Sequence, residues 1–516
     1  MTPRDLGFHE YDSWRPYQFE AVQRAVQAYK NGLKWVIIDG PTGVGKSLLA
    51  WAVAQLLGAR ALYVCTTRQL QAQLQDDFPD AAVLTGRANY PTRNFPDRFP
   101  AISCDDCELD EETPVCRLCV AYESGDTIVH ECPYKQAKSR LLSARKGIVN
   151  LALFLAEANW VGGLSGWPLV ILDEADSAEG ALASTFGLSV SERVIKRYGL
   201  PHPRATSNIE RWMEWAKEGV SLLQSQVPQL QGKAKRRARS FVSQLLGFLS
   251  SAAQEKWVCV TPNRTSGPWH VRPVKASGLA ERFLWRHAER WLTMSATICD
   301  PDQFCRDLGI PRDQAEVISL PSLFPAERRP VYWVPAGSMA RKAVNPARLV
   351  ATLDAVIATQ PSARWLVHTV SYRLASEVIS RSSYARRMVT YHSPQERTVA
   401  LQRYLSNEGS ILVAPSYARG LDLPYDACRG IVWCKVPWLD LADQRVSARL
   451  YAFTDGSRWY QLQAAREIVQ GAGRGMRAPD DSCVTWILDS DFGRLRGQLP
   501  RWFDDAVQVK PVPKLT

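Results

Sequence analysis

The stretch that most constrains this chain is residues 40–47, which read GPTGVGKS. They match G-x-x-x-x-G-K-[ST], the pattern of a phosphate-binding loop. The preceding run, residues 35–38, is apolar and predicts a strand, whereas residues 48–54 predict a helix. Between a strand and a helix, the loop N–H groups and the helix N-terminus attract phosphate oxygens. The sequence therefore predicts a nucleoside triphosphate site within an α/β fold.

Four residues of this loop have expected roles. Gly43 and Gly45 let the backbone turn tightly around the phosphates. Lys46 is expected to reach the β- and γ-phosphates, and the Ser47 hydroxyl is expected to bind Mg²⁺. A glycine-rich turn without a ligand is the alternative, and the matching flanks argue against it.

The length of 516 residues predicts about two to four domains. The net charge of +11 is compatible with a nucleic-acid partner. No apolar run is long enough for a membrane span, and the first residues do not resemble a signal peptide. We therefore expect a monomer with no membrane partner, either cytoplasmic in a bacterial or phage-type context or associated with the nucleoid.

A second motif, which is acidic, complements the phosphate loop in a nucleotide site. Residues 167–172 predict a buried parallel strand that ends at Asp173 and Glu174. Asp173 is expected to hold Mg²⁺ and Glu174 to orient and deprotonate the attacking water. Ser295 and Thr297 end a later predicted strand, and we expect their hydroxyls to couple these acids to phosphate loss.

Polar residues near the first strands are candidates for binding the base and a phosphate backbone. Arg15 and Gln18 lie upstream of the loop, and the amide of Gln18 has the donor and acceptor needed to pair with an adenine edge. Thr67 and Arg68 follow a predicted strand at residues 61–65, where they suit contact with a nucleic-acid strand. Capping of a helix by Thr67 is an equally open reading.

Five cysteines fall within thirty residues and predict a metal site, because the chain shows no secretion signal that would favour disulfides. Two C-x-x-C pairs suit tetrahedral zinc. A separate cysteine followed by proline is more typical of an iron–sulfur ligand set. Four sulfurs suffice for either metal, so one cysteine is spare. The five are Cys104, Cys107, Cys116, Cys119 and Cys132.

From about residue 326, alternating strands and helices predict a second parallel α/β unit without a phosphate loop. It carries Gln470-Gly-Ala-Gly-Arg474-Gly-Met-Arg477 directly after a predicted helix. Arg474 and Arg477 are candidate arginine fingers, which would address the γ-phosphate across a domain cleft.

Residues 181–285 read as a second, mainly helical insertion. Its basic run at residues 233–239 is either a solvated helix face or a track for phosphates. Its tryptophans could stack on bases, although core packing is the more common role.

Together these motifs resemble those of superfamily 2 helicases, and the cysteine-rich insertion resembles the XPD/DinG branch of iron–sulfur DNA helicases. The phrases GRANY at residues 86–90, CPY at 132–134 and HTVSY at 368–372 also fit that branch. Residues 416–423 look like its motif V. The histidine that commonly ends the family's Walker B motif is replaced here by Asp176.

The resemblance implies ATP hydrolysis with Mg²⁺, a 4Fe-4S cluster (with zinc as the alternative) and 5′→3′ movement on single-stranded DNA, with unwinding at single-strand/duplex junctions. It favours Cys107, Cys116, Cys119 and Cys132 as cluster ligands, with Cys104 as a spare or substitute. It adds Asp422 to the ATP site and Gln470 to the catalytic set. A translocase that remodels protein–DNA or RNA–DNA complexes without processive unwinding is the alternative activity. The implied strand contacts are Thr67, Arg68, Arg87, Tyr90, His368 and Ser416.

The predicted fold is therefore two RecA-like domains with two insertions in the first. The first domain comprises residues 1–86, 136–180 and 286–325, interrupted by an iron–sulfur insertion at 87–135 and a helical arch-like insertion at 181–285. Residues 326–516 form the second domain.

Overall fold

The computed structural model describes most of the chain. The described residues are 1–107, 132–161, 163–203, 208–252, 255–260, 268–339, 345–415, 423–476 and 480–513, with the backbone of two short strands, β4 (Ala121–Ser124) and β5 (Thr127–His130). Within these residues, no helix is both long and apolar enough to cross a lipid bilayer.

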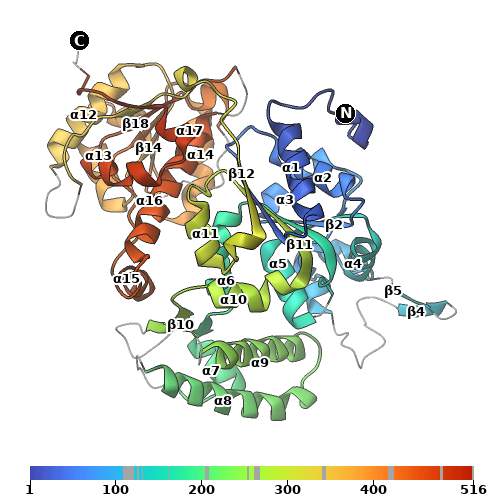
Figure 1. Ribbon diagram of the computed structural model, residues 1–516. Helices are drawn as coiled ribbons and strands as arrows, with labels where there is room; N and C mark the ends of the chain where they lie inside the picture. The colour runs from blue at the N-terminus through green and yellow to red at the C-terminus, as the bar shows by residue number, and fades with distance from the viewer. Residues whose placement is uncertain are drawn as a thin grey trace.

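Two seven-stranded sheets, in which all the pairs are parallel, form the two halves of the molecule (Figure 1). The first sheet has the order β12-β1-β11-β7-β2-β6-β3. Its strands are β1 (Trp35–Asp39), β2 (Ala61–Cys65), β3 (Ala82–Val83), β6 (Lys146–Asn150), β7 (Trp167–Leu172), β11 (Ala288–Ser295) and β12 (Ala315–Ser319).

Helices cover both faces of the first sheet because its central strands are apolar on both sides. In β1, Trp35 and Ile37 join one core, whereas Val36 and Ile38 join the other. The second core is closed by α1 (Gln18–Lys30), α2 (Lys46–Leu56) and α3 (Arg68–Asp77). The first is closed by α4 (Pro133–Ser143), α5 (Leu151–Ala156), α6 (Ala178–Thr185), α10 (Ser277–Phe283) and α11 (Pro301–Leu308).

The polar motifs meet at one edge of this sheet. The phosphate loop follows β1, and the Asp173–Glu174 pair follows β7. Asp39 at the end of β1 is in register with Ser295 at the end of β11. In open parallel sheets ligands bind at the carboxyl ends of the strands. The sheet therefore brings together at this edge motifs that are separated by up to 256 residues in the sequence, from Asp39 to Ser295.

The second sheet has the order β15-β16-β14-β17-β18-β13-β19. Its strands are β13 (Val331–Trp333), β14 (Trp365–His368), β15 (Met388–Val389), β16 (Ile411–Ala414), β17 (Gly430–Trp433), β18 (Val484–Ile487) and β19 (Val507–Val509). Its helices are α12 (Pro346–Ala358), α13 (Tyr372–Arg381), α14 (Arg397–Ser406), α15 (Gln444–Tyr451), α16 (Gly456–Ala472) and α17 (Arg501–Asp504). The predicted second α/β unit is confirmed.

Both insertions lie in connections between elements of the first domain. The first lies between β3 and α4 and contains the β4–β5 hairpin. The second lies between α6 and α10 and contains α7 (Glu192–Tyr198), α8 (Ile209–Gln226), α9 (Gly232–Ala252), and the antiparallel strands β8 (Leu188–Val190), β9 (Trp257–Val260) and β10 (Trp269–Pro273). The expectation of a helical insertion is thus incomplete, since a small sheet forms its root. Its tryptophans Trp212, Trp215, Trp257 and Trp269 pack in one core.

Candidate nucleotide cleft and cysteine cluster

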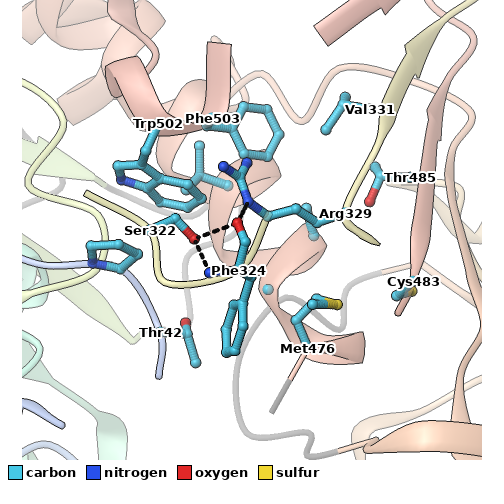
Figure 2. Close-up of a pocket in the computed structure, with 14 residues that line it drawn as sticks. Thr42, Ser322, Phe324, Arg329, Val331, Met476, Cys483, Thr485, Trp502 and Phe503 are labelled. Carbon is cyan, nitrogen blue, oxygen red and sulfur yellow. Dashed lines mark hydrogen bonds between the residues drawn. The ribbon is translucent and has the colours of Figure 1, made fainter. Parts of the chain in front are cut away.

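The phosphate loop is shaped by its glycines and closed by its lysine. Gly43 and Gly45 have φ values of 89° and 74°, in the left-handed region that side chains disfavour. The Lys46 ammonium donates to the Gly40 carbonyl at 3.0 Å. A Cβ on Gly43 would lie 2.4 Å from the ring of Phe324, which rests on the loop from the connection to the second domain (Figure 2). Gly43 is therefore required for its conformation and for space.

Gln18 and Arg15 support the loop from the side of α1. The Gln18 Nε2 donates to the carbonyls of Val44, at 3.2 Å, and Gly45, at 2.9 Å, and its Oε1 accepts from the Arg15 N–H at 3.0 Å. Arg15 also donates to the Gly43 carbonyl. Both ends of the Gln18 amide are thus already paired with backbone, so the adenine contact stays a prediction.

Tyr63 joins the two candidate Mg²⁺ ligands. Its hydroxyl donates to Asp173 Oδ2 at 2.8 Å and lies 3.4 Å from the Ser47 hydroxyl. Burial, and then the negative charge of Asp173, raise the pKa of Tyr63 well above its usual value. The phenol therefore stays protonated, and its hydroxyl lies between the side chains of Ser47 and Asp173.

The neighbouring acids are linked to the strand that carries Ser295. Glu174 has a left-handed backbone, with φ 48° and ψ 44°, a conformation that non-glycine residues adopt mostly where surrounding structure imposes it. Ser295 Oγ donates to Asp176 Oδ1 at 2.7 Å and lies 3.2 Å from the Thr297 hydroxyl. The hydroxyls of Ser295 and Thr297 are therefore hydrogen-bonded to the acidic motif through Asp176, while their predicted coupling to phosphate loss stays a prediction.

The second domain meets this edge through α16. The Thr297 hydroxyl donates to Gln470 Oε1 at 3.3 Å. Arg466 donates to the carbonyls of Thr297, at 3.0 Å, and Ile298, at 3.3 Å. A Cβ on Gly473 would lie 3.3 Å from the Thr42 hydroxyl of the phosphate loop. One continuous set of contacts therefore runs from the acidic motif to the second domain.

A pocket lies where the two domains meet beside the phosphate loop. Thr42 lines it from the first domain, Phe324 and Arg329 line it from the connecting segment, and Met476 and Trp502 line it from the second domain (Figure 2). Arg329 Nε donates to the Phe324 carbonyl at 2.9 Å, which fixes the turn that carries the Phe324 ring. Both domains thus contribute residues to a single cleft.

Asp39 is a buried acid at the start of the loop. Burial raises its pKa from 3.8 to about 6, although N–H groups of Cys299 and Ile298 and the charges of Lys46 and Arg466 oppose the rise. Cys299 has a positive φ of 59°. The turn that follows Thr297 is therefore held between Asp39 of the first domain and Arg466 of the second.

The candidate arginine fingers are described in part. Arg474 is buried in a short turn, Gly473–Gly475, that follows α16, and its carbonyl accepts from the Leu423 N–H at 3.4 Å. Its guanidinium is close enough to His368 to contribute, after burial, to lowering the pKa of that imidazole to about 3. Arg477, Asp422 and Ser416 lie outside the described residues.

The cysteine cluster is partly described. Cys104, Cys107 and Cys132 are all buried, and the sulfurs of Cys104 and Cys132 lie 3.8 Å apart. Cys116 and Cys119 lie outside the described residues. The sequence prediction treats Cys104 as the spare cysteine, whereas the structure puts its sulfur beside that of Cys132. Two buried thiols this close together are compatible with ligation of a metal by thiolates. Within the described residues, however, no group of three or more histidine, cysteine, aspartate or glutamate side chains is arranged to hold a metal ion.

Helix α9 of the second insertion holds the loop that carries these cysteines. Lys233 forms ion pairs with Asp105 and Asp106, at 2.7 and 2.9 Å. Arg236 donates to the carbonyls of Asp105 and Cys107, both at 2.7 Å. Two residues of the basic run thus bind the first insertion, a role that neither sequence reading anticipated.

Comparison with known proteins agrees with this architecture. Residues 355–506 match the family model described as "Helicase C-terminal domain", and residues 12–101 match "Type III restriction enzyme, res subunit". Over 165 residues, 29% of this chain, the sequence is 24% identical to the general transcription and DNA repair factor IIH helicase subunit XPD/RAD3 of Saccharomyces cerevisiae. That match spans 21% of the length of the yeast protein.

Solved structures match nearly the whole chain. The structure named "XPD_Helicase" aligns with a TM-score of 0.64 and 15% identity, covering 97% of this chain and 100% of that one. S. tokodaii Xpd4 aligns with a TM-score of 0.61 and 13% identity, covering 96% and 100%. The fold is therefore that of the XPD helicase structures, and the second domain matches a helicase C-terminal family model. The XPD-like arrangement includes both RecA-like domains.

The candidate contacts with a nucleic-acid strand fall into two groups. Thr67 and Arg68 are exposed at the carboxyl edge of the first sheet, where Thr67 Oγ1 also caps α3 by accepting from the Leu70 N–H at 3.2 Å. His368 is only 1% exposed and stacks on Trp433, with 4.1 Å between ring centroids. This placement does not support the predicted strand contact of His368.

Arg87 and Tyr90 lie beside the cysteine loop. The Arg87 guanidinium stands 4.5 Å from the centre of the Tyr134 ring, and the Tyr90 hydroxyl accepts from the Thr85 N–H at 3.1 Å. Both residues are half-buried. Their part in binding a strand remains a prediction.

Sequence reasoning missed Tyr63, Asp39 and Arg466. Tyr63 gives a weak local signal, because a tyrosine in an otherwise apolar buried strand needs a partner for its hydroxyl. Asp39 gives a similar signal as the only acid in β1. Arg466 gives none, since its acceptors are backbone carbonyls about 170 residues away.

Proposed function

We propose that this protein is an ATP-driven motor that moves 5′→3′ along single-stranded DNA and separates duplex DNA at junctions. The observation that carries the proposal is the meeting of the phosphate loop with Gly473, next to Arg474, across the two domains. The choice of DNA and the direction of movement come from the family resemblance. The hydrogen-bonded path from Asp176 to Gln470 supports coupling between hydrolysis and domain movement.

The residues of the cleft divide the hydrolysis step among them. Lys46 leaves the Gly40 carbonyl to bind the β- and γ-phosphates, while Ser47 and Asp173 hold Mg²⁺. Glu174 orients the attacking water and accepts its proton. Arg474, with Arg477, stabilises the charge that develops on the γ-phosphoryl group. After phosphate leaves, movement of Thr297 is transmitted to α16 through its contacts with Gln470 and Arg466.

The single strand of DNA is expected to run across the carboxyl edges of both sheets. Thr67 and Arg68 are exposed there and suit contact with phosphates. Closing of the cleft on ATP and opening after hydrolysis would change the grip of the two domains in turn. Each cycle then advances the protein by about one nucleotide, the step implied by the family resemblance.

The cysteine loop is proposed to hold a metal centre, with a 4Fe-4S cluster favoured by the family resemblance and zinc as the other outcome. Cys104, Cys107 and Cys132 are the candidate ligands among the described residues, and Cys116 and Cys119 complete the set. The group would cross-link a loop that has little apolar core of its own. Iron and zinc analysis of anaerobically purified protein distinguishes the two metals.

The Lys46→Ala variant tests the motor. Without the ammonium, the γ-phosphate loses its main cationic partner on the loop, so we expect ATP hydrolysis to fall at least a hundredfold. Single-stranded DNA binding should change less than threefold. Hydrolysis is measured with and without single-stranded DNA, and unwinding is measured on duplexes with a 5′ or a 3′ tail.

Lys30→Ala is the matched control, because Lys30 is an exposed lysine at the end of α1. It should leave hydrolysis unchanged. Wild-type turnover in Lys46→Ala would remove the motor reading. A wild-type protein that displaces streptavidin from DNA but separates no tailed duplex would instead be the translocase without processive unwinding.

A further inference from the structure

Helix α15 of the second domain lies away from its own sheet and against the first domain and the root of the second insertion (Figure 1). Its second residue, Arg445, makes two contacts with those parts. The Arg445 NH2 lies 2.7 Å from Glu179 Oε1, and Nε donates to the Pro273 carbonyl at 2.9 Å. The side chains of Arg445 and Glu179 are 15% and 10% exposed.

These three residues belong to three different parts of the molecule. Glu179 lies in α6, which begins just after the acidic motif that ends at Asp176. Pro273 is the last residue of β10, at the root of the second insertion. Arg445 therefore joins the second domain to the acidic-motif helix and to the insertion at the same time.

Neighbouring contacts strengthen both connections. Glu179 uses its other oxygen to accept from Trp459 Nε1 of α16 at 3.0 Å. Lys275, two residues beyond β10, lies 3.4 Å from Asp455 and over the ring of Phe453, both in the α15–α16 connection. The insertion root thus contacts the α15–α16 hairpin at two points.

We propose that Arg445 is a coupling residue that transmits closure of the nucleotide cleft to the second insertion. The insertion is covalently part of the first domain, but Arg445 and Lys275 also bind it to the second. A change in the angle between the domains must then either move the insertion root or break a largely buried contact. A guanidinium serves both acceptors because its planar fork presents several N–H donors, whereas a lysine ammonium is a single point charge.

This inference rests on the proposed motor activity, so its test includes a readout that needs only nucleotide binding. Hydrogen exchange of residues 269–273 is measured in full-length protein, with and without a non-hydrolysable ATP analogue. We expect the analogue to slow exchange of this strand in the wild type. In Arg445→Ala the slowing should disappear, although the analogue binds with unchanged affinity.

Measurements of ATP hydrolysis and duplex unwinding distinguish a coupling role of Arg445 from a general role in stabilising the interface. In Arg445→Ala, DNA-stimulated ATP hydrolysis should stay within about twofold of wild type, while duplex unwinding falls at least tenfold. Arg445→Lys keeps the charge and the fold but should recover unwinding only in part. Gln444→Ala, an exposed neighbour on α15, is the matched control and should behave as wild type.

Three outcomes would overturn the inference: unchanged unwinding, equal loss of hydrolysis and unwinding, or the same nucleotide-dependent protection of residues 269–273 in Arg445→Ala. If that variant melts early, Glu179→Gln removes the charge pair while leaving an acceptor for Trp459, and the same readouts apply. A wild-type protein without DNA-stimulated hydrolysis would contradict the proposed function, while the exchange arm would still decide the role of Arg445.

Discussion

The nucleotide cleft and the cysteine cluster are assembled in different ways. The cleft is built on the ends of parallel strands, and its polar groups are already hydrogen-bonded to one another, as Tyr63 is to Asp173. The cysteine loop instead depends on charges from another part of the chain, because Lys233 and Arg236 of α9 hold residues 105–107. The cleft is therefore preformed by the fold, whereas the cysteine cluster depends on a contact between two insertions, to which the proposed metal would add.

The largest expected effect tests the cleft alone. Arg474→Ala removes a buried arginine next to Gly473, the residue at which the second domain meets the phosphate loop. Loss of an arginine finger typically lowers turnover on the order of 10³-fold. We expect that loss in DNA-stimulated ATPase assays at saturating ATP, with metal content unchanged.

Arg403→Ala removes an exposed arginine of α14 and should have no such effect. A loss smaller than tenfold in Arg474→Ala would assign the finger role to Arg477. A loss of metal in the same variant would show that the cleft and the cluster are not independent.

A smaller effect concerns the free energy of unfolding, which the buried carboxylate of Asp39 in the cleft is expected to lower. The pKa of Asp39 is raised to about 6, so its charged form is disfavoured by folding. The folded protein therefore binds this proton more tightly than the unfolded chain, and stability falls as pH rises from about 4 to 6. Two pKa units correspond to about 3 kcal/mol. Asp39→Asn should be more stable than wild type by about that amount at pH 8.

The gain of Asp39→Asn should shrink toward pH 5 and vanish below about pH 4, where Asp39 is protonated in both states. Thermal unfolding at several pH values measures it, and Asp313→Asn, at an exposed aspartate, is the control. A gain that does not change with pH would mean that the carboxylate is not under electrostatic strain. The cleft would then have no stability cost to contrast with the cluster.

Local sequence predicted the parts of the cleft that sit at the ends of strands. Residues 40–47 and Asp173 follow apolar runs, and the parallel sheet brings such ends together. It did not predict pairings that depend on packing. His368 is the last residue of β14, yet its ring is buried and stacks on Trp433.

Contacts between segments that are distant in the sequence could not be predicted from local sequence patterns. Arg445 and Glu179 are 266 residues apart, and Arg236 and Cys107 are 129 residues apart. The basic run of α9 could be recognised from the sequence, but its partner could not. A charge pattern indicates that a helix face is polar, whereas the fold decides which carbonyls or acids lie opposite it.

The smallest expected effect tests the cluster. Arg236→Ala removes two hydrogen bonds to the loop that carries Cys104 and Cys107, so the bound metal should escape about three- to tenfold faster. Release to a chelator is followed by absorbance or metal analysis. Turnover of ATP should be nearly unchanged, because these two hydrogen bonds join Arg236 to the cysteine loop and not to the cleft.

Arg237→Ala is the matched control, since Arg237 is the exposed neighbour on the same helix and carries the same charge. If both variants release metal at the same faster rate, the general positive field of α9 stabilises the thiolates, rather than the contacts of Arg236. If neither does, the metal alone holds the loop in place. The cysteine cluster would then be as self-sufficient as the cleft, and the contrast between the two sites would lie only in their ligands.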